Sequence, residues 1–138
     1  MIFTLTGCER GERCVIERTE EGFASRTEDT STANDWLRST TPWEARVCAT
    51  LLLKSSPEEA TAHSRARREA LSSWPQPFAR SDFAWVTPPV LNPFTRIAVE
   101  MCAASGTLRA VGYEPEPGGT LPRRATQVRE LAVAGLPA

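Results

Sequence analysis

The fold is decided first by residues 2–16, IFTLTGCERGERCVI, at the start of the chain. Residues 2–6 alternate large apolar residues with threonine, and residues 14–16 are again apolar and β-rich. Between them, residues 7–12 are polar and contain two glycines. Two short β-rich runs around a glycine-containing turn are typical of a β-hairpin. Residues 22–27 add a further short strand, so the sequence predicts an antiparallel sheet here.

The pattern changes to helical spacing at Pro42. Trp43, Val47, Leu51 and Lys54 recur at intervals of three and four residues, and proline suits the first position of a helix. We therefore predict a helix over residues 42–54.

A second helix is predicted from Pro57 to about Trp74. Ser56 is a suitable N-cap, and two carboxylates follow in the first turn, where the helix dipole favours negative charge. The apolar stripe is thin and made mostly of alanines. Three arginines are interpreted as the solvated face of this helix: Arg65, Arg67 and Arg68.

The strand pattern returns after the helices. Residues 94–101 and 107–113 are β-rich and surround an Ala-Ser-Gly turn, which predicts a second hairpin. Residues 114–122 hold three prolines and two glycines and indicate a tail or linker, followed by a short helix over residues 123–134. The predicted fold class is α+β, with antiparallel strands and two adjacent helices on one face. The predicted domain covers residues 1–113, and the tail covers residues 114–138.

Composition excludes several function classes. The chain has 138 residues and a net charge of -1, with dispersed arginines, which argues against a nucleic-acid partner. No apolar run reaches the roughly 20 residues of a membrane span, and the first residues lack the pattern of a secretory signal, so we expect a cytoplasmic protein. His63 is the sole histidine and the four cysteines are far apart, so neither a metal nor a cofactor is expected. In the cytoplasm the cysteines are expected to be reduced thiols.

Two polar groups resist a packing explanation. Asn34, Asp35 and Trp36 follow a stretch rich in threonine, serine and aspartate, and Asn92 ends a stiff segment with two prolines. Asn34 has two interpretations: a functional amide donor, or a turn residue whose amide caps a nearby backbone group. Trp36 is interpreted as a core residue, and Asn92 as a structural cap at the start of a strand.

The order of several short motifs resembles the C-terminal half of acid ceramidase and its relatives, which include N-acylethanolamine acid amidase and bacterial linear-amide hydrolases. The motifs cover roughly residues 1–113. They are Gly11-Glu12-Arg13-Cys14-Val15-Ile16-Glu17-Arg18, Asn34 with Trp36, Arg46, and Pro89-Val90-Leu91-Asn92 with Thr95.

This resemblance implies part of the αββα sandwich of N-terminal-nucleophile hydrolases. In that family, self-cleavage exposes a cysteine whose thiolate attacks an amide carbonyl. Asn34 matches the family's asparagine, whose N–H donor stabilises the oxyanion of the tetrahedral intermediate. Arg46 matches an arginine of the site's polar network, although Glu44-Ala45 stands where relatives have two aspartates. The alternative for Arg46 is a solvated helix arginine.

The family's nucleophile has no counterpart in this sequence. Removal of Met1 would expose Ile2 rather than cysteine, and cleavage before Cys8 would fall in a predicted turn. We therefore expect this chain to supply oxyanion stabilisation to a cysteine amidase acting on linear N-acyl amides, with the nucleophile on an N-terminal portion. Alone, it is expected to be inactive. The alternative is a non-catalytic truncated product or a small α+β protein-interaction domain.

Overall fold

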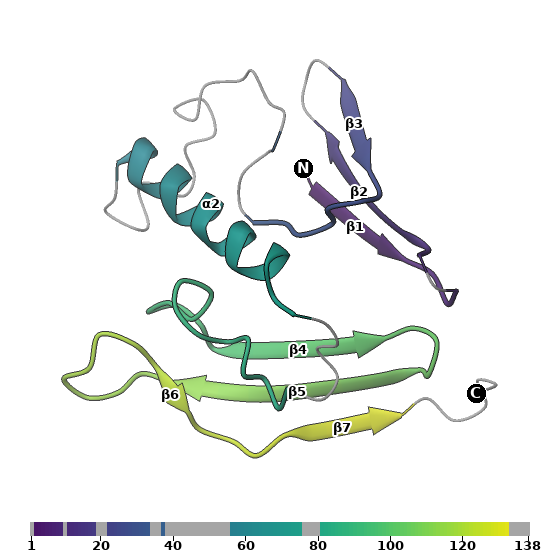
Figure 1. Ribbon diagram of the computed structural model, residues 1–138. Coiled ribbons are helices and arrows are strands. Elements are labelled where there is room, and N and C mark those ends of the chain that lie inside the picture. The colour runs from purple at the N-terminus through teal and green to yellow at the C-terminus, as the bar shows by residue number, and fades with distance from the viewer. Residues whose placement is uncertain are drawn as a thin grey trace. The chain divides into compact units, whose positions relative to one another are not determined.

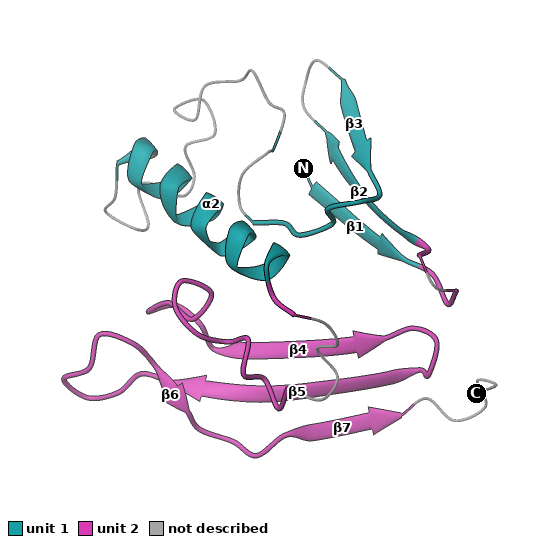
Figure 2. Ribbon diagram, in the orientation of Figure 1, with its two compact units in different colours: residues 1–6, 13–73 teal, residues 7–12, 74–138 magenta. Residues whose placement is uncertain are grey.

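The computed structural model describes residues 2–9, 11–18, 22–33, 37, 56–75 and 81–132. Within this part of the chain, one helix and two antiparallel sheets form an α+β fold (Figure 1). The chain divides into two compact units, which are described separately: residues 1–6 with 13–73, and residues 7–12 with 74–138 (Figure 2).

The sheet of the first unit has three strands in the order β1-β2-β3. They are β1 (Ile2–Thr6), β2 (Arg13–Arg18) and β3 (Phe23–Arg26). The predicted hairpin is confirmed, with Thr4 opposite Val15 and a positive φ of 90° at Gly11 in the turn. Val15 is fully buried, so one face of the sheet contributes to the interior of the unit.

Helix α2 (Pro57–Ser72) begins as the sequence predicts. The Ser56 Oγ accepts the N–H of Glu59, and the Glu59 carboxylate accepts the N–H of Ser56, which makes a complete capping box. Its buried residues lie four apart, at Ala60, Ser64 and Arg68. The burial of Arg68 is a correction, because the sequence placed this arginine on the solvated face.

One helix lies in the described part of the chain, whereas the sequence predicted two adjacent helices on one face of the sheet. The earlier predicted helix, over residues 42–54, falls outside the described residues.

The sheet of the second unit is built on one long strand. Strand β5 (Thr107–Glu114) pairs on one side with β4 (Ile97–Cys102) and on the other with β6 (Arg123–Arg124) and β7 (Arg129–Ala132). The second predicted hairpin is thereby confirmed. Its inner face places Ala98 opposite Val111, and both pack with Phe83 and Val86 in the buried core of this unit.

The predicted short helix over residues 123–134 is wrong, because the described part of this segment forms β6 and β7. The free side of β5 offers backbone donors and acceptors that a helix would leave unpaired. The Ala125 N–H donates to the Gly112 carbonyl at 2.8 Å, and Leu131 lies opposite Leu108. Pairing with β5 therefore outweighs local helix propensity.

None of the described helical residues forms a segment long and apolar enough to cross a membrane.

Replacement of Val111 by alanine should lower the free energy of unfolding by about 2 kcal/mol, because it removes buried methyl groups and leaves a cavity. Val99→Ala is the matched control, since Val99 is 37% exposed on the neighbouring strand. Urea denaturation followed by circular dichroism measures both variants. Equal losses for the two valines would contradict the assignment of the core.

Candidate functional site

The two residues predicted to take part in catalysis, Asn34 and Arg46, lie outside the described residues, as does Trp36. The described chain resumes on both sides of residues 34–36, with Ala33 before them and Leu37 after them. The candidate site is therefore built from the side chains that hold these flanking segments.

A buried ion pair joins the two strands that precede Asn34 in the sequence. Antiparallel register places Arg26 opposite Val15, and Glu17 opposite Ala24. Because alternate residues of a strand share a face, Glu17 and Arg26 lie diagonally on the same face. Their closest atoms, Nη2 of Arg26 and Oε1 of Glu17, are 3.4 Å apart, and the side chains are only 13% and 5% exposed.

The same pair binds backbone groups on both sides of residues 34–36. Before them, the Arg26 guanidinium donates to the carbonyl of Asp29 and, at 2.7 Å, to the carbonyl of Ser31. After them, the Leu37 N–H donates to Oε2 of Glu17 at 2.8 Å. Both flanking segments are therefore held by one ion pair on the sheet.

Asp29 extends this network towards helix α2. Its carboxylate accepts the N–H of Ser31 at 3.1 Å and also the Ser31 hydroxyl. Burial raises the pKa of Asp29, but hydrogen bonds from Ser31 and Ser72 and the charge of Arg26 together bring that pKa below its ordinary value. Asp29 is thus a carboxylate at neutral pH, and it links the segment after β3 to the last residue of α2.

The second unit contains a separate polar cluster around Glu100. The Trp85 indole N–H donates to Oε1 at 2.8 Å, and the Arg109 guanidinium donates to Oε2 at 2.7 Å. Arg109 also lies 5.4 Å from the ring centroid of Phe83, in cation–π geometry. Because both carboxylate oxygens are used, this cluster fixes the loop that carries Phe83 and Trp85 onto the sheet.

Asn92 acts as a structural cap, in agreement with the sequence analysis. Its Nδ2 donates to the Val90 carbonyl at 3.2 Å, and its Oδ1 accepts the Phe94 N–H at 3.0 Å. Its backbone N–H also donates to the Thr95 hydroxyl at 3.1 Å. Both ends of the amide make local turn contacts, which is the structural role that the sequence analysis expected.

The thiols among the described residues are all free. Cys8 is exposed in the turn after β1, and Cys14 is half-buried in β2. Cys102 is exposed at the end of β4, where hydrogen bonds from the Ser105 hydroxyl and from the backbone of Ser105 and Ala104 lower its pKa. A thiol with a lowered pKa is a better nucleophile near neutral pH than an ordinary one.

The sequence analysis missed the network of Glu17, Arg26 and Asp29. A signal was present, because Glu17 follows Val15 by two residues and so shares its buried face. The ion-pair partner of Glu17 could not be predicted from the sequence pattern, because it is the strand register that places Arg26 beside Glu17. Across the described ranges, no group of three or more histidine, cysteine, aspartate or glutamate side chains is placed to hold a metal ion.

Comparisons of this chain with models of known protein families, with curated proteins and with solved structures gave no match.

Substitution of Glu17 by glutamine should lower the free energy of unfolding by about 3 kcal/mol, because the largely buried Arg26 then keeps only its longer ion pair with Asp29, at 3.9 Å. Glu114→Gln is the matched control: its pair with Arg123 is solvent-exposed and should contribute less than about 1 kcal/mol. Chemical denaturation of both variants gives the comparison. Equal stability of the two variants would contradict the stabilising role assigned to Glu17.

Alkylation should reveal the lowered pKa of Cys102. In the folded protein the thiolate of Cys102 forms at a lower pH than that of an ordinary thiol. The rate of its alkylation by iodoacetamide should therefore begin to rise at a lower pH. Ser105→Ala removes the main cause, and the rate profile of Cys102 should move to higher pH. Peptide mapping by mass spectrometry measures this rate, with Cys14 in the other unit as the internal reference. An unchanged profile in Ser105→Ala would refute the assigned cause.

Proposed function

We propose that this chain is the C-terminal portion of a cysteine N-terminal-nucleophile amidase that hydrolyses linear N-acyl amides. In this proposal Asn34 donates to the oxyanion, Arg46 belongs to the polar network of the site, and an N-terminal portion carries the nucleophile. The αββα sandwich is the fold that the assembled protein would have.

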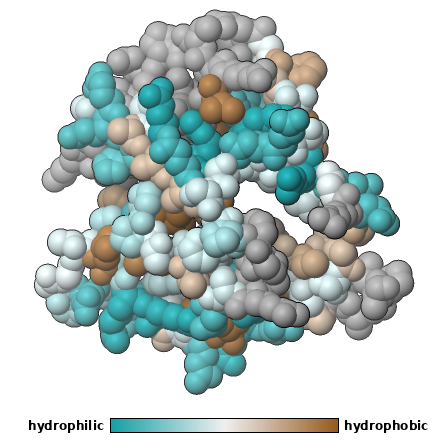
Figure 3. Space-filling model, viewed as in Figure 1, coloured by the Kyte–Doolittle hydropathy of each residue, from teal (hydrophilic) through white to brown (hydrophobic). Residues whose placement is uncertain are grey.

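The observation that carries the proposal is an apolar face left open on each of the two sheets. In the second unit, alternate residues of β4 and a residue of β7 are exposed on the face opposite the core: Ile97, Val99, Met101 and Leu131. In the first unit the exposed residues are Phe3, Leu5 and Phe23. Apolar groups reach the surface as brown areas among hydrophilic ones in Figure 3.

A sheet in an αββα sandwich is covered on both faces, so a chain lacking part of the sandwich should expose apolar faces of this kind. An open strand edge is a further expectation, and no described strand pairs with the outer edge of β4. The alternative, a self-contained interaction domain, predicts closed sheet edges. An edge of β4 that no described strand covers is what the hydrolase portion predicts.

The ion pair of Glu17 and Arg26 supports the role of Asn34. An oxyanion donor is effective when it is fixed before the charge develops, because no reorganisation is then needed. Backbone groups at Asp29, Ser31 and Leu37 are bound by this pair on both sides of the segment that contains Asn34. Such anchoring is what a positioned donor requires.

The chemistry needs one group from each portion. The cysteine thiolate attacks the amide carbonyl, the new C–S bond forms, and the negative charge moves to the carbonyl oxygen. The Asn34 amide N–H stabilises that oxygen. Collapse of the intermediate breaks the C–N bond, and the amine leaves with the proton that the cysteine's own α-amino group took from the thiol. Water then releases the acyl group and restores the thiol.

The test is co-expression of this chain with the product encoded immediately upstream, assayed on N-acyl amides. The assembled protein should hydrolyse them, and Asn34→Ala should lower kcat by about 100-fold to 1000-fold. Asn92→Ala is the matched control, because its amide serves a turn, and it should retain kcat within about twofold when corrected for folded protein.

Two outcomes would decide against the proposal. A co-folded pair without amidase activity would exclude the amidase assignment for the assembled protein. If the pair is active and Asn34→Ala has the same kcat as the parent, the amidase assignment would stand but Asn34 would not be the oxyanion donor. Met101→Asp offers a separate check, since a charge on the open apolar face should weaken association of the two portions.

A further inference from the structure

Two turns of the second unit each carry an exposed thiol. Cys8 lies in the turn between β1 and β2, and Cys102 is the last residue of β4, before the turn to β5. Although residues 7–12 connect strands of the first unit, they group with residues 74–138, as Figure 2 shows. The two thiols therefore belong to one compact unit.

Both thiols contact the same peptide group. Sγ of Cys8 donates to the carbonyl oxygen of Ala103 at 3.8 Å. Sγ of Cys102 accepts from the backbone N–H of Ala104, and also from the hydroxyl and the N–H of Ser105. The Ala103 carbonyl and the Ala104 N–H are the two polar ends of one planar peptide unit. A single peptide group therefore lies between the two sulfur atoms, although Cys8 and Ala103 are 95 residues apart in the sequence.

Little packing opposes a small shift of the two turns. The two ends of a trans peptide group point in opposite directions, so the sulfur atoms must move towards each other before they can bond. The described residues of the first turn, 7–9, 11 and 12, are all exposed, and none of residues 102–106 is buried. Exposed turns make movements of this kind readily.

The surroundings of Cys102 favour its oxidation. Hydrogen bonds, chiefly from the Ser105 hydroxyl, lower the pKa of this thiol. Because peroxides oxidise the thiolate, an exposed thiol with a lowered pKa reacts early. Cys14 is half-buried in β2 and belongs to the first unit, and Cys48 lies outside the described residues. Cys8 is thus the described thiol that is placed to react with an oxidised Cys102.

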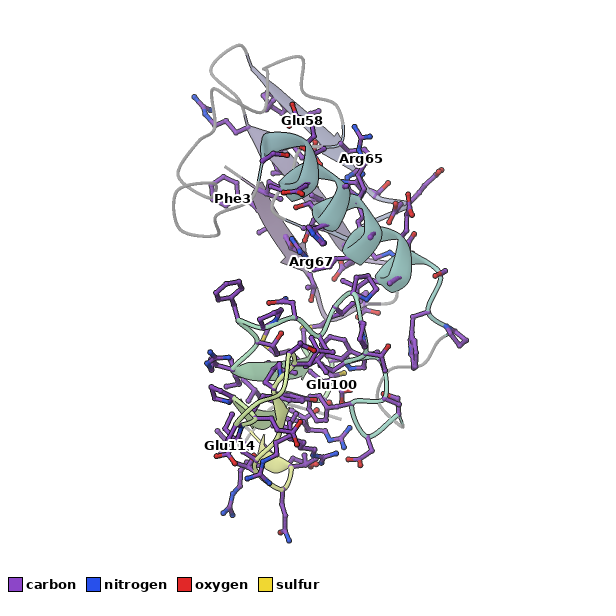
Figure 4. All side chains as sticks on the ribbon, turned by 90° about the vertical axis from the view of Figure 1, so that its left-hand side faces the viewer. Phe3, Glu58, Arg65, Arg67, Glu100 and Glu114 are labelled. Carbon is purple, nitrogen blue, oxygen red and sulfur yellow. The ribbon has the colours of Figure 1, made fainter. Side chains whose placement is uncertain are left out.

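Cys102 is separate from the open apolar face of its strand. It follows Glu100, which Figure 4 labels, by two residues, and alternate residues of a strand share a face. The open apolar face carries Val99 and Met101 instead. Chemistry at Cys102 therefore uses none of the residues of the proposed amidase function.

We propose that Cys8 and Cys102 form a redox-sensitive disulfide, with a peroxide as the oxidant. The Cys102 thiolate attacks one oxygen of the peroxide and the O–O bond breaks. Hydroxide leaves and takes the proton that the thiol had released, and Cys102 becomes a sulfenic acid. The Cys8 sulfur then attacks the Cys102 sulfur, the S–O bond breaks, and a second water leaves with the Cys8 proton. Two electrons pass from the sulfurs to the peroxide, and the bridge fastens the two turns together.

Peptide mapping of the full chain after brief exposure to hydrogen peroxide tests the bridge. The reduced chain is oxidised at low protein concentration, alkylated, and digested without reductant. A cross-linked Cys8–Cys102 peptide should be the main oxidised product, and dithiothreitol should release it. In Cys8→Ser, Cys102 should stop at the sulfenic acid, which dimedone labels. Cys14→Ser is the matched control and should form the bridge as the parent does.

Several results would overturn the proposal. They are a main product that links Cys8 or Cys102 to Cys14 or Cys48, a disulfide between two copies of the chain, and the absence of any cross-link. Oxidation of Cys102 to the sulfinic acid while Cys8 stays a free thiol would be equally decisive. If Cys14→Ser does not fold, the peptide map of the parent still distinguishes these outcomes.

Thermal denaturation provides a second readout. A bridge between residues so distant in the sequence restricts the unfolded chain, so the bridged parent should have a Tm at least about 5 °C above that of the reduced parent. The same treatment should not raise the Tm of Cys8→Ser. Equal Tm values for the reduced and bridged parent would contradict the fastening of the two turns.

Discussion

A carboxylate that is almost wholly buried, Glu17, sets the main constraint on the first unit. It needs a cation, and strand register supplies one by placing Arg26 diagonally across β2 and β3. Both side chains also bind backbone groups: Arg26 donates to the carbonyl of Ser31, and Glu17 accepts the N–H of Leu37. The conformation after β3 thus depends on an ion pair formed within the sheet. Removal of either charge would affect both the sheet and the segment that follows it.

The second unit depends in a comparable way on β5. This strand receives β4 on one side and β6 and β7 on the other, while Val111 contributes to its core. Glu100 and Arg109 lie directly opposite each other on β4 and β5, and Trp85 joins them through its indole N–H. The polar contact and the apolar core therefore share one face of the sheet, which leaves the other apolar face open.

The open apolar faces and the anchored flanks of Asn34 are the observations on which the proposed amidase portion rests. That proposal requires a second polypeptide segment. The Cys102 thiol, although its pKa is lowered, has no described base or oxyanion donor assigned to it. It is an exposed thiol, and the proposed amidase chemistry assigns it no role.

The sequence by itself determined the elements with strong local signals. Alternation and turn glycines fixed the hairpin of β1 and β2, and Ser56 with Glu59 fixed the start of α2, because these effects act over a few residues. It also identified Asn92 as a cap. Asn34 was singled out by its polar surroundings in the sequence, but its catalytic role and the selection of Arg46 came from the resemblance, and both roles remain proposals. Only the tertiary structure decided that residues 123–124 and 129–132 form strands, because their backbone groups pair with the free edge of β5. It likewise decided that Arg68 is buried and that Arg26 neutralises Glu17, since register and packing between distant segments are not encoded in local periodicity.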